Sequence, residues 1–129
     1  MKIKMLMLLF IPCVLWANDS CKNIQVSDQV FNCAKETFTN HDAEMNKTYK
    51  ALLAEIKKRY ASEPEAGAEF IEKIKISQRA WIHFRDANCP VFTLDVETGS
   101  QVYETSLYDC ESEMTIKRTD ELKKILRYL

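Results

Sequence analysis

The residues of this 129-residue chain that could carry out catalysis form few recognisable patterns. Of its two histidines, His41 and His83, only His83 has a nearby carboxylate, because Asp86 follows it by three positions. A helix would place that carboxylate where it could orient the imidazole. No serine, cysteine or metal ligand completes a catalytic motif at the required spacing. Because a solvated surface histidine explains the pattern more simply, we expect no enzyme, no catalytic residue and no metal site.

Composition argues against two further classes of function. The chain has only two glycines, Gly67 and Gly99, which lie 32 positions apart and cannot form a glycine-rich phosphate-binding loop. The formal net charge is −1 and there is no long basic run, so we expect no nucleic-acid binding. The sequence implies no cofactor.

The N-terminal segment has the pattern of a secretory signal peptide. Lys2 and Lys4 precede an apolar run over residues 5–16, and an alanine follows at a cleavage point. The run is shorter than the roughly 20 residues that span a bilayer. We therefore predict that residues 1–17 are a signal peptide and that residues 18–129 form one domain. The mature domain would be periplasmic or secreted, without stable membrane insertion; the alternative is a retained N-terminal anchor.

Signal removal would take away Cys13 and leave four cysteines, Cys21, Cys33, Cys89 and Cys110. An even number of cysteines in a small exported domain predicts two disulfides. Of the three possible pairings we favour Cys21–Cys33 and Cys89–Cys110, because each closes a short loop. Such loops contribute about 3 kcal/mol each in the chain-entropy estimate. A metal site is the weaker alternative, because the chain has no C-x-x-C pair. The mature domain would carry 16 basic and 19 acidic residues, a net charge of −3.

Apolar periodicity predicts an all-α fold, and the scarcity of glycine and proline argues against a β-sandwich or barrel. Ser27 is a candidate cap for the first helix. Ser62 and Glu65 match a capping box, and Pro64 is tolerated in a first turn. We expect helices over residues 27–38, 42–60, 64–88 and 101–128, with a polar break at 39–42 and a loop at 91–100. The fold would be a small disulfide-stapled bundle of about four helices, in which the last two form a long hairpin.

Polar residues interrupt the apolar stripes of these helices. Arg85 and Arg118 fall within stripes made for packing, and a buried guanidinium costs several kcal/mol unless it is paired. The candidate network comprises Asn46, Gln78, Trp81, Arg85, Asp86 and Arg118, with Asp42, Glu44, Asp86 and Glu111 as the candidate acids. We favour a structural network that fixes helix register. The alternative is a polar pocket, floored by Trp81, for an anionic or sugar ligand.

The order of these residues resembles the LprI-type lysozyme inhibitor family of small exported bacterial helical domains. The most specific stretch reads Gln78-Arg79-Ala80-Trp81-Ile82-x-Phe84-Arg85-Asp86-x-x-Cys89. The match also includes Cys21 with Cys33, the Met45-Asn46-x-x-Tyr49-x-x-Leu52 segment, Gly99-Ser100, Cys110, Thr115, Arg118 and Leu122. The resemblance implies an exported helical domain and, for part of the family, inhibition of lysozyme. It supplies no catalytic residues.

A lysozyme inhibitor must cover or plug the enzyme's cleft, and the loop over residues 90–101 is the candidate contact. Apolar anchors, a few charges and a disulfide-constrained backbone suit such a role. The candidate partner-binding residues are Phe92, Leu94, Asp95, Glu97, Gly99 and Ser100. Alternatively, Phe92 and Leu94 close the end of the bundle. The partner would be a lysozyme or other cell-wall hydrolase. The competing functions are a generic periplasmic interaction or adaptor module and, less favoured, an enzyme acting on peptidoglycan or a small ligand.

Overall fold

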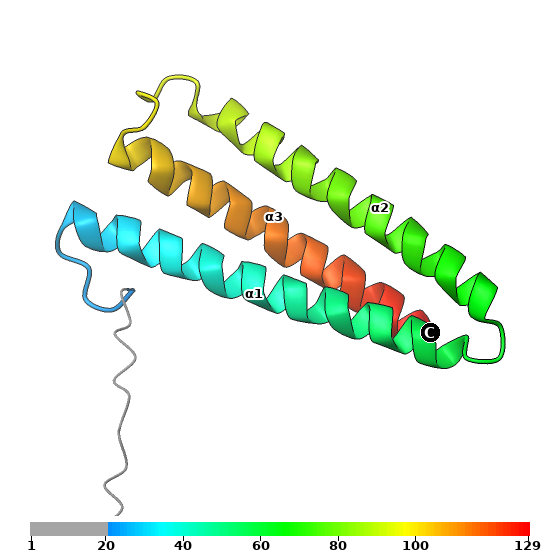
Figure 1. Cartoon of the computed structure of the whole chain (residues 1–129). Helices are drawn as coiled ribbons and strands as arrows, with labels where there is room; N and C mark the ends of the chain where they lie inside the picture. The colour runs from blue at the N-terminus through cyan, green and yellow to red at the C-terminus, as the bar shows by residue number, and fades with distance from the viewer. Residues whose placement is uncertain (1–20) are drawn as a thin grey trace, which may run out of the picture.

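The computed structural model describes residues 21–129, which form three α-helices and one short 3-10 helix (Figure 1). They are α1 (Ser27–Arg59), α2 (Pro64–Asn88), the 3-10 helix η1 (Cys89–Thr93) and α3 (Gln101–Tyr128). The chain runs up, down and up, so α1 and α3 point the same way and α2 runs against both (Figure 1). The described residues contain no strand, and no helix among them is both long and apolar enough to cross a membrane. The predicted signal peptide and Cys13 lie outside the described residues.

The first of the three α-helices replaces two predicted ones. The break expected at residues 39–42 is wrong, because α1 is continuous from Ser27 to Arg59. This polar stretch contains neither proline nor glycine, so nothing in it prevents helical backbone. The Thr39 hydroxyl donates to the carbonyl of Lys35, one turn earlier, at 2.8 Å. Asp42 faces α2 and accepts from Arg85, so its polarity marks a contact between helices rather than a turn.

The ends of α2 and α3 agree with the predicted limits, whereas two predicted caps are wrong. The backbone N–H groups before α1 are satisfied by the Gln29 side chain, and the N-cap is Val26 rather than Ser27. At α2 the N-cap is Glu63 without a side-chain hydrogen bond, so the capping box predicted for Ser62 and Glu65 does not form. Pro64 occupies the first turn, as expected.

Gly99 and Ser100 together set the start of α3. Gly99 has φ of +81°, in the left-handed region that glycine adopts without steric cost. The Ser100 hydroxyl then accepts the backbone N–H of Tyr103 at 3.2 Å and caps the helix. The loop of residues 91–100 is thus partly ordered, with η1 at its beginning and a capped helix at its end.

The core lies mainly between α1 and α3, which approach each other closely along their lengths. Met45, Leu52 and Ile56 of α1 pack with Leu122 of α3 and Ile74 of α2. Small polar residues of α3 are also buried there, and these are Ser112, Thr115 and Thr119. Because their side chains are short, they allow the two backbones to come close. The predicted hairpin of the last two long helices is present, but its two members approach each other at few points.

Both disulfides lie at the end of the bundle where α1 and α3 begin (Figure 1). They join Cys21 to Cys33 and Cys89 to Cys110, the pairing that the sequence favours. The first fastens the segment before α1 onto that helix, and the second fastens the end of α2 and η1 onto α3.

Aromatic packing joins α1 to α3 at the same end. The rings of Phe31 and Phe38 lie 5.9 and 5.7 Å from the ring of Tyr108. Val30, which the sequence places on the same packed face, is instead exposed. The first turn of α1 therefore leaves part of its apolar surface uncovered.

Candidate functional site

Arg85 joins all three α-helices in one buried cluster. Only 8% of this α2 residue is exposed, and its Nε donates to Asp86 at 2.9 Å. Its Nη1 donates to Asp42 of α1 at 3.2 Å and to the hydroxyl of Thr115 of α3 at 3.3 Å. The guanidinium also lies over the ring of Phe38, with its central carbon 5.3 Å from the centroid. A buried charge is tolerated here because two carboxylates compensate it.

Arg118 forms the second half of the network and is also only 8% exposed. Its Nε donates to the side-chain oxygen of Gln78 at 3.0 Å, and its Nη2 donates to the Ser77 hydroxyl at 3.0 Å. Its Nη1 donates to Glu121 at 2.9 Å. Gln78 in turn donates to the sulfur of Met45 at 3.5 Å. Each guanidinium nitrogen of Arg118 therefore has a partner within the fold.

Trp81 lies between the two arginines. Its ring is 5.3 Å from the central guanidinium carbon of Arg85 and 5.9 Å from that of Arg118. Both cations face the ring, whose negative face attracts them and which stays packed between them. Trp81 thus serves as a shared packing surface for two cations.

Asn46 lies at the edge of the network and not in the core. Its side chain is exposed and donates to Asp42 at 2.9 Å. The inward orientation predicted for Asn46 is wrong, because the neighbouring Met45 takes the buried position. Asp86 also stays partly exposed while its carboxylate accepts from Arg85.

The acids of the network differ in part from those expected. Asp42 and Asp86 pair with Arg85, but Arg118 pairs with Glu121, which sequence reasoning missed. Glu121 could have been found from its position three residues after Arg118, because residues at this spacing lie on the same face of a helix. Glu44 instead pairs with the surface residue Lys123 at 3.1 Å.

Glu111 is half-buried beside the network, and its carboxyl has no hydrogen bond among the described residues. Desolvation raises its pKa above the ordinary value of 4.5, and the nearby Arg85 guanidinium opposes the shift. The surrounding carboxylates of Asp86, Glu104 and Asp42 act in the same direction as burial. Glu111 is therefore the carboxyl group here whose charged form the fold least favours.

The partners of the network are internal to the fold, so the arrangement resembles a register-fixing network more than an open binding pocket. The positive charges of Arg85 and Arg118 are matched by Asp42, Asp86 and Glu121. His83 lies exposed on α2, and the Oδ1 atom of Asp86 accepts from Arg85. Among the described residues, no group of three or more histidine, cysteine, aspartate or glutamate side chains could hold a metal ion.

The loop after α2 presents large apolar side chains to solvent. Phe92 is 73% exposed and Leu94 is 82% exposed, so neither closes the end of the bundle. Cys89, which precedes them, and Thr93, which lies between them, are buried, and the Thr93 hydroxyl donates to the carbonyl of Pro90 at 2.8 Å. The backbone is thus anchored while the apolar side chains project from it.

Other residues of the predicted contact loop lie beside these apolar side chains in the sequence. Asp95, Glu97 and Gly99 are exposed, and Ser100 is partly buried because it caps α3. The loop therefore combines two carboxylates with two projecting apolar groups. Gly99 and Ser100 shape the loop rather than offering a surface.

More apolar residues are exposed at the same end of the bundle, which sequence reasoning did not single out. They belong to the segment before α1, to the first turns of α1 and α3, and to η1 (Figure 1). These residues are Ile24, Val26, Val30, Val91 and Val102. We call this region, together with Phe92 and Leu94, the apolar end. It contains most of the large apolar side chains that are exposed among the described residues.

Comparison with known proteins places this disulfide-stapled three-helix fold in a family. The family model described as "Lysozyme inhibitor LprI" matches residues 18–122. The chain therefore belongs to the LprI family, and this family is not a known enzyme family.

Two individual proteins are similar to the chain. An uncharacterized protein of Rhizobium meliloti (strain 1021) is 37% identical over 101 residues, which cover 73% of this chain and 69% of that protein. The crystal structure of a DUF1311 family protein from Pseudomonas putida KT2440 has the same fold, with a TM-score of 0.69 and 23% sequence identity. That comparison covers 80% of this chain and 96% of the other.

Proposed function

We propose that the protein is an exported, lysozyme-inhibitor-like binding protein that blocks a cell-wall hydrolase by direct contact. The family suggests this activity, and two disulfides together with the signal-peptide pattern support export to an oxidising compartment. The observation that carries the proposal is the anchored loop at the apolar end. Large side chains on a constrained backbone give affinity because little conformational entropy is lost on binding.

Charge supports a basic partner. Asp95 and Glu97 lie on the loop beside the apolar anchors, and the domain without residues 1–17 has a net charge of −3. Complementary charge accelerates the encounter with a basic hydrolase more than it strengthens the final complex. We therefore assign affinity to Phe92 and Leu94 and the rate of association to the carboxylates.

The test is a cell-wall lysis assay with the oxidised, exported protein titrated against several classes of lysozyme. We expect near-stoichiometric loss of lysis with one class. The double variant Phe92→Ser/Leu94→Ser should weaken inhibition by at least tenfold, because it removes both anchors without altering buried residues. The matched control is Ile76→Ser/Phe84→Ser, which removes two exposed apolar residues from α2.

The control should inhibit like the parent protein. Equal loss of inhibition in both double variants would contradict a role for the apolar end. Absence of inhibition and of complex formation with every lysozyme class would overturn the proposed activity.

The alternative is a periplasmic interaction or adaptor module without inhibitory activity. The exposed Ile76 and Phe84 on α2 favour it, since they offer apolar surface away from the loop. It would be supported if a defined envelope protein bound the parent and Phe92→Ser/Leu94→Ser equally but failed to bind Ile76→Ser/Phe84→Ser.

A further inference from the structure

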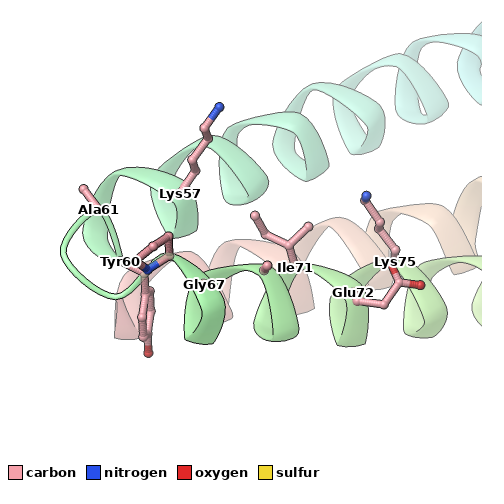
Figure 2. Close-up of a pocket in the computed structure, with 9 residues that line it drawn as sticks. Lys57, Tyr60, Ala61, Gly67, Ile71, Glu72 and Lys75 are labelled. Carbon is pink, nitrogen blue, oxygen red and sulfur yellow. The ribbon is translucent and has the colours of Figure 1, made fainter.

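A groove lies at the opposite end of the bundle from the disulfides, where α1 ends and α2 begins (Figure 2). Its volume is about 710 Å³, within the range of small-molecule sites, which is roughly 300–1,000 Å³. The walls are the last turn of α1 and the first three turns of α2. From Pro64 to Lys75 the groove extends about 16 Å at 1.5 Å per helical residue.

The inner surface of this groove is apolar. Tyr60 and Ala61 contribute from the turn after α1, and Ala68 and Ile71 contribute from α2. Gly67 lets α2 approach α1 closely, because a Cβ atom at this position would lie only 2.8 Å from the Cβ of Tyr60. Beyond the first turn of α2, the helix backbones that form the walls have their hydrogen bonds satisfied internally, so most of the surface offers few groups to a polar ligand.

Two lysines without partners stand beside the apolar surface. Lys57 and Lys75 line the groove, and neither has an ion pair or hydrogen bond among the described residues. In Figure 2 their side chains extend to the same side of the helices as Ile71, which lies between them. Lys75 is partly buried and also lines the next cavity along the seam between α1 and α2.

Acidic residues nearby do not neutralise these two lysines. Glu72 lines the groove but accepts from Arg79 at 3.2 Å. Glu55 and Glu69, on the same helices, pair with Lys58 and Lys73. Lys58 and Lys73 thus have acidic partners, whereas Lys57 and Lys75 have none among the described residues.

We propose that this groove binds a fatty acid with a chain of the length of dodecanoate, with its alkyl chain along Tyr60, Ala68 and Ile71 and its carboxylate attracted by the positive charges of Lys57 and Lys75. The chemistry follows from the lining: the alkyl chain needs no hydrogen bonds, and the two ammonium groups favour an anionic head. The ligand takes no part in contact with a hydrolase, so this site is independent of the proposed inhibitory function.

A peptide suits the groove less well. An extended peptide would lose the hydrogen bonds of its backbone to water without finding partners on the helical walls. A helical peptide would have to order its backbone on binding and pay the conformational entropy of doing so. An alkyl chain avoids both costs.

The test is calorimetric titration of the oxidised full chain with dodecanoate, below the concentration at which it forms micelles. We expect saturable binding at one site. Dodecanol, which has the same chain without the charge, should bind about five- to tenfold more weakly, and so should dodecanoate at high salt. Acetate, which has the charge without the chain, should not bind.

Matched pairs of variants locate the site. Lys57→Gln/Lys75→Gln should weaken dodecanoate binding about five- to tenfold, whereas Lys58→Gln/Lys73→Gln, with the same change in charge on the same helices, should not. Ala68→Trp should abolish binding by filling the groove. Ala66→Trp, at an exposed position two residues earlier and outside this groove, should leave binding intact.

All four variants change exposed or partly exposed residues, so their thermal unfolding should match that of the parent and show that they fold. The proposal is overturned if the parent shows no saturable binding. It is equally overturned if Ala68→Trp binds like Ala66→Trp, or if the two lysine pairs have the same effect.

Discussion

Glu111 makes the stability of the bundle depend on pH in an unusual direction. Its pKa is raised by desolvation, so the folded state holds the proton more tightly than the unfolded chain does. Such a group favours folding below its unfolded-state pKa, and this contribution is lost as the pH rises through the folded-state pKa. At neutral pH the ionised carboxyl of Glu111 therefore opposes folding.

We expect Glu111→Gln to raise the melting temperature at pH 7 and to leave it nearly unchanged at a pH well below 4.5, where the carboxyl is protonated in both the folded and the unfolded state. Thermal unfolding across this range measures the difference. Glu113→Gln is the control: its carboxyl is exposed, and a hydrogen bond from Lys117 lowers its pKa. If Glu113→Gln raised the melting temperature at pH 7 as much as Glu111→Gln does, burial of Glu111 would not be the cause.

Arg118 offers a second test at the level of single residues. Arg118→Met keeps an apolar side chain over Trp81 but leaves the buried oxygen of Gln78 without its donor. We expect the free energy of unfolding to fall by about 1–3 kcal/mol, the cost of a buried unsatisfied polar group. Urea denaturation measures the change.

Removing both partners should cost less than the two single changes suggest. The double variant Arg118→Met/Gln78→Leu eliminates the unsatisfied oxygen, and we expect it to recover part of the lost stability. If the losses in unfolding free energy caused by Arg118→Met and by Gln78→Leu simply add in the double variant, the hydrogen bond between Arg118 and Gln78 contributes little. Lys117→Met, at an exposed neighbouring position, serves as the control.

At the scale of elements, the turn between α1 and α2 depends on one glycine. Replacing glycine by alanine inside a helix ordinarily gains up to about 1 kcal/mol. At Gly67 the added Cβ would meet the Cβ of Tyr60 at 2.8 Å, which forces the two helices apart. We therefore expect Gly67→Ala to lower the free energy of unfolding by about 1–3 kcal/mol, measured by urea denaturation.

The background variant Tyr60→Gly separates these two effects because it removes the opposing Cβ. In that background Gly67→Ala should be neutral or stabilising, as helix propensity alone predicts. A loss of the same size in both backgrounds would rule out the contact with Tyr60 as the cause.

The elements differ in how well the sequence predicts them. The limits of α2 and α3 follow from signals that act locally, since Pro64 starts one helix and Ser100 caps the other. The polar stretch in the middle of α1 was predicted as a break because its side chains are of the types common in turns, although it contains neither proline nor glycine. Asp42 is held by Arg85, 43 positions away, and no local pattern announces that contact.

The candidate sites show the same division. The periodic placement of Gln78, Arg85 and Arg118 is enough to predict that they face inward. Their partners are harder to predict. Glu121 follows Arg118 by three positions on the same helix, whereas the choice of Asp42 for Arg85 among several candidate acids depends on how α1 and α2 pack. The groove of Lys57 and Lys75 was not predicted at all, since it depends on how closely Gly67 approaches Tyr60.

At the scale of the whole molecule, the two disulfides tie different parts of the same end. We expect Cys89→Ala/Cys110→Ala to lower the free energy of unfolding by about 3 kcal/mol, and Cys21→Ala/Cys33→Ala by a similar amount, in the chain-entropy estimate. Amide hydrogen exchange should distinguish the two double variants, because only Cys89→Ala/Cys110→Ala should speed exchange in η1. Equal acceleration of η1 in both variants would contradict this separation.

The cross-link at Cys89–Cys110 also determines how α2 can move. This helix approaches α3 at few points, yet the turn at residues 60–63 fixes one of its ends to α1 and the disulfide fixes the other to α3. A helix fastened at both ends cannot swing outward. The hydrogen bonds of Arg85 to Asp42 and Thr115, and those of Arg118 to Gln78 and Ser77, also hold its middle against rotation about its own axis. The position of α2 is therefore set by a turn, a buried polar network and a covalent bond rather than by close packing against α3.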